Sequence, residues 1–269
     1  MKRTLADIFR YGFLILVSFL SVFPLLWMLI SATNKSVDVV RGTLLPGAYL
    51  FENFKGLLAS QDLARAMKNS FVNATTLTLI SLLICSLAGY GFEIFHTRGK
   101  DRIMRVLLTA MMVPFAATLI PLFQMFSEMD LLNTTVGFIL PTISTPFLIM
   151  MFRQSARSFP HDIIEAARID GVSEIGIFFK MFLPTMRSTY AAAMTITFMN
   201  AWNNYLWPKI IMLSDKQTTM PMLVANLITG YVTDYGMLML AVLVCTLPTV
   251  IIFFLLQKSF AEGITGAVK

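Results

Sequence analysis

Six apolar runs, each long enough to cross a lipid bilayer, dominate this sequence. Hydrophobic residues make up 57% of its 269 residues and charged residues only 13%, and the mean hydropathy is +0.73. A helix of about 20 apolar residues spans the bilayer core and satisfies its own backbone polar groups there. The sequence therefore predicts an all-α, polytopic membrane protein with a single transmembrane domain over residues 1–269. The predicted spans are residues 11–31, 71–92, 106–126, 135–152, 188–212 and 236–256.

Basic residues are divided unequally between the segments that connect these runs. Fourteen of the 21 Lys and Arg residues lie before the first run, between the second and third, between the fourth and fifth, or after the sixth. Loops rich in Lys and Arg stay in the cytoplasm, so both termini are predicted to face it. The first run is too long for a signal peptide and lacks a small-residue cleavage pattern, which favours a retained helix. The basic residues form no long patch, and no nucleic-acid partner is expected.

The apolar runs contain little that can drive transport or catalysis. No Asp, Glu, Lys, Arg or His lies clearly inside them, whereas ion-coupled carriers commonly place such groups in the membrane. Cys85 and Cys245 lie in apolar runs and are expected to pack as small hydrophobes, without a disulfide, metal or cofactor. Gly99 and Lys100 lack the other residues of a phosphate-binding loop. We therefore expect no enzyme, and a transporter built on this chain would need a separate cytoplasmic motor.

Residues 157–187, here called the signature loop, contain the longest stretch that mixes charge with helical periodicity, from Pro160 to Pro184. Pro160 suits the first turn of a helix, because its missing N–H needs no partner there. Glu165 falls near the positive end of that helix, and Gly171 supplies a left-handed residue that ends it. The short side chains on one helix face would let another protein approach closely. That face contains Ile163, Ala166, Ala167 and Asp170.

A second short helix is predicted directly after the glycine. Ser173 is placed to cap it, Glu174 lies in its first turn, and Pro184 interrupts it. Its predicted apolar side contains Ile175, Phe178, Phe179 and Phe182. Two short helices are therefore expected to meet at a glycine corner on the cytoplasmic side.

The spacing of these residues resembles the cytoplasmic signature loop of ABC importer permeases. Glu165-Ala166-Ala167 is followed after three residues by Gly171 and after nine more by Met181-Phe182-Leu183-Pro184, with Met181 where that pattern usually has Ile. Over its whole length the chain is similar to the carbohydrate-uptake permeases, the maltose-type or MalG-like family. Two further stretches carry this resemblance. They are Asn200-Ala201-Trp202-Asn203 with Leu206-Trp207-Pro208, and the tail Gln257-Lys258-Ser259-Phe260 with the residues from Gly263 to Lys269.

The resemblance implies partners and a location. They are a second, different permease, two ATPase subunits and an extracytoplasmic sugar-binding protein, assembled in the lipid of a bacterial cytoplasmic (inner) membrane. The signature loop would be the coupling-helix loop between the fourth and fifth spans. Its ATPase-docking residues would be Glu165, Ala166, Ala167, Asp170 and Gly171. The tail would contact the ATPase pair at Gly263 and Gly266, unless it is a frayed terminus.

Amide and aromatic residues of the fifth span suggest a substrate path. Asn amides can bond sugar hydroxyls, and Trp can stack on sugar rings. The candidates are Asn200, Trp202, Asn203 and Asn204. Tyr205 and Trp207 fit equally well in an aromatic belt at the outer membrane interface. In the family, the partner permease often holds most of the sugar contacts.

The predicted function is inward transport of a mono- to oligosaccharide, driven by ATP hydrolysis in a separate subunit. Permeases for other solutes, such as glycerol phosphate or amino acids, share the signature loop and are the nearer alternative. A membrane scaffold that recruits a cytoplasmic protein through the same loop is the more distant one. The segment from Ser214 to Tyr235 is predicted to lie outside, as a contact for the binding protein or as a simple connector.

Overall fold

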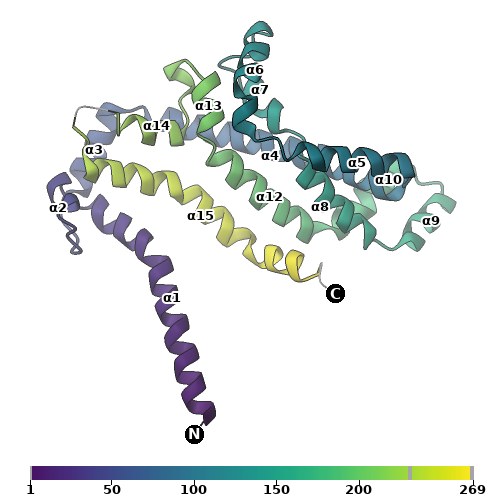
Figure 1. Ribbon diagram of the computed structural model, residues 1–269, viewed down its shortest axis with the longest axis horizontal. Coiled ribbons are helices and arrows are strands. Elements are labelled where there is room, and N and C mark those ends of the chain that lie inside the picture. Colours follow the sequence, from purple (N-terminus) through teal and green to yellow (C-terminus); the bar gives the residue numbers. More distant parts are fainter. Residues whose placement is uncertain (1, 230–231, 267–269) are drawn as a thin grey trace. The chain divides into compact units, whose positions relative to one another are not determined.

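The computed structural model describes residues 2–229 and 232–266, and these residues form helices and connecting turns without a strand (Figure 1). The chain divides into two compact units, Met1–Ala64 with Met220–Pro248, and Arg65–Thr219 with Thr249–Lys269. Two of the three boundaries between them fall inside the long helices α4 and α15, and the third lies just before α14. The prediction of an all-α membrane protein is confirmed.

The first unit gathers its helices from the two ends of the sequence. They are α1 (Lys2–Ala32), α2 (Ser36–Val40), α3 (Leu50–Ser60), α14 (Met220–Asn226) and the first part of α15 (Tyr235–Gly266). Buried Asn53 closes the end of α1, because its amide donates to the carbonyl oxygens of Ala32 at 2.9 Å and Asn34 at 3.0 Å. The last carbonyls of a helix have no partner within it, and this amide supplies one.

The second unit contains the remaining helices and the whole signature loop. Its elements are α4 (Leu63–Ile94), α5 (Arg98–Ala110), α6 (Phe115–Glu128), α7 (Thr135–Ile139), η1 (Leu140–Thr142), α8 (Pro146–Arg157), α9 (His161–Ile169), α10 (Glu174–Ile177), η2 (Phe178–Phe182), α11 (Leu183–Thr185), α12 (Arg187–Trp202), α13 (Leu206–Ile211) and η3 (Asp215–Gln217). Two buried apolar clusters join these helices. One packs α4, α5, α8 and α12 together, and the other lies beneath the signature loop.

Three helices among the described residues are long and apolar enough to cross a membrane, within Asp7–Ala32, Leu63–Ile94 and Tyr235–Gln257. They correspond to the first, second and sixth predicted spans. Two further pairs of helices qualify only if each bent pair counts as one span, which raises the number to five. The pairs are Arg98–Ala110 with Phe115–Glu128, bent by 98°, and Thr135–Thr142 with Pro146–Arg157, bent by 58°.

Prolines account for the two bends. Pro114 precedes α6 in an extended conformation, and Pro146 opens α8 behind the cap residue Thr145, whose Oγ1 accepts from the Leu148 N–H. A proline cannot donate to the preceding turn and pushes the residue before it out of helical geometry. The predicted spans 106–126 and 135–152 are therefore bent helix pairs and not single helices. The predicted span 188–212 is divided between α12 and α13, with a break at residues 203–205.

Helices α4 and α8 approach each other closely at Gly89. A Cβ atom at this position would lie 2.6 Å from the Cβ of Phe152 and 2.7 Å from the backbone nitrogen of Arg153. Only a residue without a side chain fits such a crossing, because real Cβ atoms do not come so near their neighbours. This contact sets the distance between the helix that leads into the signature loop and the long helix beside it.

Candidate functional site

The glycine corner of the signature loop is a regular helix C-cap. Gly171 has a φ of +74°, its N–H donates to Arg168 O at 3.1 Å, and the N–H of Val172 donates to Ala167 O at 2.9 Å. These two bonds define a Schellman motif, in which glycine adopts the left-handed conformation without strain. Val172 completes the motif by packing onto the apolar cluster that contains Ala167. The corner is thus built entirely from residues close together in the sequence.

The second helix begins as predicted and then changes its winding. Ser173 caps α10, with its Oγ accepting from the Gly176 N–H at 3.2 Å. Residues Phe178–Phe182 then form a π-helix, η2, which ends two residues before Pro184. A π-helix takes up one extra residue in a turn, and such turns occur often at functional sites.

The exposed and buried faces of α9 differ from the predicted face. Ile164 and Ala167 are buried at 1% and 2% exposure, whereas Ile163, Ala166 and Asp170 are exposed. Of the five predicted docking residues, Glu165, Ala166, Asp170 and Gly171 are exposed. The fifth, Ala167, packs inside the chain and holds α9 in place.

An aromatic cluster beneath the loop fastens it to α4 and α8. Tyr90 of α4 contacts Phe178 and Phe182, with ring centroids 5.4 and 5.0 Å apart, and Phe159 packs edge-on against Phe182 at 5.6 Å. Phe159, Phe178 and Phe182 are at most 1% exposed. Such rings bury much area and prefer defined mutual orientations. The loop is therefore packed closely against the ends of these two helices.

Apolar side chains on the outer side of the same loop face away from this cluster. Ile169 is 85% exposed and Ile175 69% exposed, and Phe179 is also exposed. The predicted apolar side of the second helix is thus divided, with Phe178 and Phe182 inside and Ile175 and Phe179 outside. The exposed apolar side chains are the kind of surface that marks a protein contact.

An ion pair crosses the corner between the two short helices. Arg168 donates through Nε to Glu174 Oε1 at 2.6 Å, and its guanidinium lies 5.8 Å from the ring centroid of Phe95. The hydrogen bond to Glu174 raises the pKa of Arg168 above its ordinary value. Both groups are about 40% exposed, so the pair contributes little to stability.

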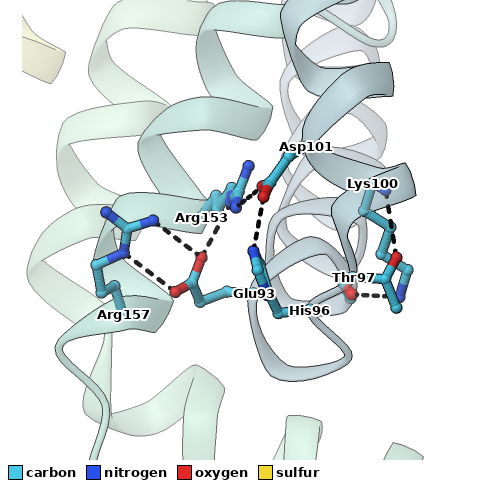
Figure 2. Close-up of polar contacts among 8 residues, drawn as sticks. Glu93, His96, Thr97, Lys100, Asp101, Arg153 and Arg157 are labelled. Carbon is cyan, nitrogen blue, oxygen red and sulfur yellow. Dashed lines mark hydrogen bonds and ion pairs between the residues drawn. The ribbon is translucent and has the colours of Figure 1, made fainter.

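A second group of charged residues lies where α4, α5 and α8 meet, and the sequence did not reveal it. Figure 2 shows Arg153 of α8 between Glu93 of α4 and Asp101 of α5. Arg153 donates to Glu93 Oε2 at 3.0 Å and to Asp101 Oδ1 at 2.6 Å. Arg157 adds a bond to Glu93 Oε1 at 3.1 Å, and His96 lies 2.9 Å from Asp101 Oδ2. The arginines and their carboxylates are 52 to 64 residues apart in the chain, so no local sequence pattern predicts these ion pairs.

The predicted substrate-path residues do not share one environment. Asn200 and Asn203 are exposed, whereas Trp202 is 1% exposed and stacks on Phe198. Asn204 is partly buried, and its Oδ1 accepts from the Trp207 N–H at 3.4 Å, which starts α13 after the break. Of the four, only Asn200 and Asn203 therefore offer exposed amides beside the helix break.

Trp207 is a core residue, and the structure contradicts its alternative assignment to an aromatic belt. It is fully buried, its indole N–H donates to Gly137 O at 3.0 Å, and its ring packs edge-on against Phe126. A buried tryptophan with a satisfied N–H fixes the position of neighbouring helices. Here it joins α13 to α6 and α7.

Two predicted regions are described only in part. Helix α15 continues through Gly263 to Gly266, and the remaining tail, residues 267–269, lies outside the described residues. Residues 230–231 of the predicted outer segment also lie outside them. Within the described ranges, no three His, Cys, Asp or Glu side chains gather to hold a metal ion.

Comparisons with known proteins identify relatives of this chain. A family described as binding-protein-dependent transport system inner membrane component matches residues 81–266. The chain is 43% identical to the lactose transport system permease protein LacG of Rhizobium radiobacter, covering 100% of this chain and 98% of the relative. It is 34% identical to the arabinooligosaccharides transport system permease protein AraQ of Halalkalibacterium halodurans, covering 100% of both.

A solved structure has the same fold. It is a bacterial ABC transporter involved in the import of the acidic polysaccharide alginate, and one of its chains matches with a TM-score of 0.83 at 18% identity. The match covers 97% of this chain and 98% of that one.

Proposed function

The chain belongs to the family of binding-protein-dependent transport inner membrane components, and from this premise we propose that it moves a neutral saccharide inward as one permease of an ATP-driven importer. The 43% identity to a lactose permease over the full length is the observation that carries the proposal. The Asn side chains exposed beside the break after α12 support a hydroxyl-rich solute, because amides both donate to and accept from hydroxyl groups.

We propose that the ATPase docks on the solvent-exposed face of the signature loop, which points away from the aromatic cluster. The exposed residues Glu165, Ala166, Asp170 and Gly171 are the polar and small part of this surface, and Ile169 adds an apolar anchor. Anchors of this kind become buried at interface centres, while small side chains let the partner approach the backbone. Ala167 supports the surface from beneath.

The substrate path is proposed to run past Asn200 and Asn203 of this chain. Asn204 and Trp202 contribute indirectly: Asn204 starts the next helix and Trp202 fills the space behind the break. A helix break within a membrane protein is tolerated where it lines a cavity or is buried in protein, which supports this location.

The family implies an ATPase and an extracytoplasmic binding protein as partners, and we place ATP hydrolysis in that separate ATPase. A second, different permease completes the proposed complex. Both termini are proposed to face the cytoplasm, because the Lys and Arg residues favour that orientation. Gly263 and Gly266 near the end of α15 would then lie on the ATPase side.

Reconstitution of the complex in proteoliposomes tests the proposal. The complex is purified through a tag on this chain, and ATPase activity and solute uptake are measured with its binding protein and either lactose, an arabinooligosaccharide or glycerol 3-phosphate. We expect one of the two saccharides to stimulate both activities. Stimulation by glycerol 3-phosphate alone would contradict the saccharide assignment, and ATP hydrolysis without uptake of any solute would contradict transport.

A further inference from the structure

The charged group at the meeting point of α4, α5 and α8 differs from an ordinary surface cluster in its burial. Arg153 is 6% exposed, and the Glu93 side chain is only 13% exposed. Taking such charges out of water is costly, and apolar residues of similar size often hold helices together as well or better. The network is therefore a poor device for stability alone.

This network fixes the orientation of the helices, which the packing around it does not. The hydrophobic effect that holds the apolar clusters on either side together is not directional, because it depends on the apolar area that is buried. The planar guanidinium of Arg153 instead reaches two carboxylates on two different helices, at 3.0 and 2.6 Å. Arginine pairs of this kind fix geometry because the donors form a rigid fork. The angle between three helix ends is thereby defined.

Position along the chain connects the network to the signature loop. Arg153 lies on α8 between Phe152, which belongs to the cluster with α5 and α12, and Ala156, which belongs to the cluster under the loop. Glu93 lies one turn beyond Gly89, where α4 and α8 touch. The Lys100 ammonium donates to Gly91 O at 2.9 Å and so connects α5 to α4. Arg153 connects both of these helices to α8, the helix that leads into the signature loop (Figure 2).

We propose that Arg153 is a positioning residue, which makes the ends of α4, α5 and α8 follow the signature loop as one body when the ATPase moves it. This role rests on the proposed function of the chain as an importer subunit. Two carboxylates, Glu93 and Asp101, face two arginines, Arg153 and Arg157, so the charges of these four groups balance. Removal of the directional bonds would let the loop move without the membrane helices.

Replacement of Arg153 by methionine tests this role, because it keeps the volume and removes the bonds. The matched control is Arg102→Met, which alters an exposed arginine of α5 next to Asp101 in the sequence. In proteoliposomes of the complete complex, the number of saccharide molecules imported per ATP hydrolysed is measured, together with thermal stability. We expect Arg153→Met to lose some thermal stability, because Glu93 then keeps only Arg157 and Asp101 only His96. It should retain ATPase activity but lower the ratio by about fivefold or more. Arg102→Met should leave it unchanged.

An unchanged ratio in Arg153→Met would overturn the role, as would a parallel loss of stability, ATPase activity and uptake. If that variant yields no complex, Asp101→Ala decides, since it removes the acceptor on α5 and leaves the Glu93 pair intact. A lowered ratio in Asp101→Ala supports the role, and a normal ratio rejects it. The wild-type complex separates the two proposals: if it imports no saccharide, the proposed function fails, whereas coupled transport by Arg153→Met rejects only this inference.

Discussion

At the scale of single residues, some residues of the signature loop determine its backbone conformation, and others are exposed on its surface. Gly171 shapes it through its left-handed conformation, and its surroundings are open, since a Cβ atom at this position would meet no other atom within 4 Å. Glu165 does not shape the loop but is exposed on the surface of α9. Substitutions at these two positions should therefore act by different physical routes.

At Gly171, the conformation of the backbone can be tested separately from side-chain size. Gly171→Ala should reduce uptake, because a left-handed alanine costs about 1 to 2 kcal/mol. Gly171→Asn should retain more uptake although its side chain is larger, because Asn tolerates this conformation better. The measurement is uptake normalised to the amount of the chain in the membrane. The reverse order would mean that crowding against the ATPase, and not the turn, governs this position.

At Glu165, a change of charge should act on docking alone. Glu165→Lys is expected to lower uptake and co-purification of the ATPase by about tenfold or more, since an unfavourable charge at an interface costs several kcal/mol. Glu165→Gln is the matched control and should lose less, because it keeps the size and hydrogen-bonding capacity. The amount of chain in the membrane should be normal in both. Full co-purification of the ATPase with Glu165→Lys would remove this residue from the docking surface.

At the scale of elements, the short helices of the loop depend on the longer helices beneath them. Helices α9 and α10 have nine and four residues, and isolated helices of that length are marginal in water. Burial of Ile164, Phe178 and Phe182 in one cluster with Tyr90 supplies the missing stability. The π-helix η2 belongs to this arrangement, because it directs Phe178 and Phe182 to the same cluster.

Phenylalanine truncation tests the dependence of the loop on this cluster. Phe182→Ala should destabilise the protein by about 3 to 5 kcal/mol, the usual range for a buried phenylalanine. Phe179→Ala, in the same π-helix but exposed, should have a much smaller effect. Thermal unfolding of the two purified variants in detergent measures the difference. Equal losses of stability would show that the cluster does not anchor the loop.

At the scale of the whole molecule, the proposed orientation makes opposite predictions for two connecting segments. Gly99 is exposed at the start of α5 and is proposed to face the cytoplasm, whereas Lys216 is exposed in η3 and is proposed to face outward. The native cysteines, Cys85 and Cys245, are not joined in a disulfide and would be replaced first. This orientation follows from the distribution of Lys and Arg.

Cysteine labelling in intact cells tests the orientation. With a membrane-impermeant maleimide, Lys216→Cys should react readily and Gly99→Cys only after the membrane is opened. Each variant serves as the control for the other, since both positions are exposed within the chain. Labelling of Gly99→Cys from outside would reverse the proposed topology.

The sequence by itself determined the features that depend on neighbouring residues. Long apolar stretches require membrane helices, prolines interrupt them, and Gly171 with Ser173 specifies the corner of the signature loop through bonds between residues close together in the chain. Tertiary structure decided which sides of these helices face inward, because periodicity defines a stripe but not the partner that covers it. It thus buried Ala167 and exposed Ile169. It also assembled the charges around Arg153, since contacts between residues 52 and 60 positions apart arise only when three helices pack together.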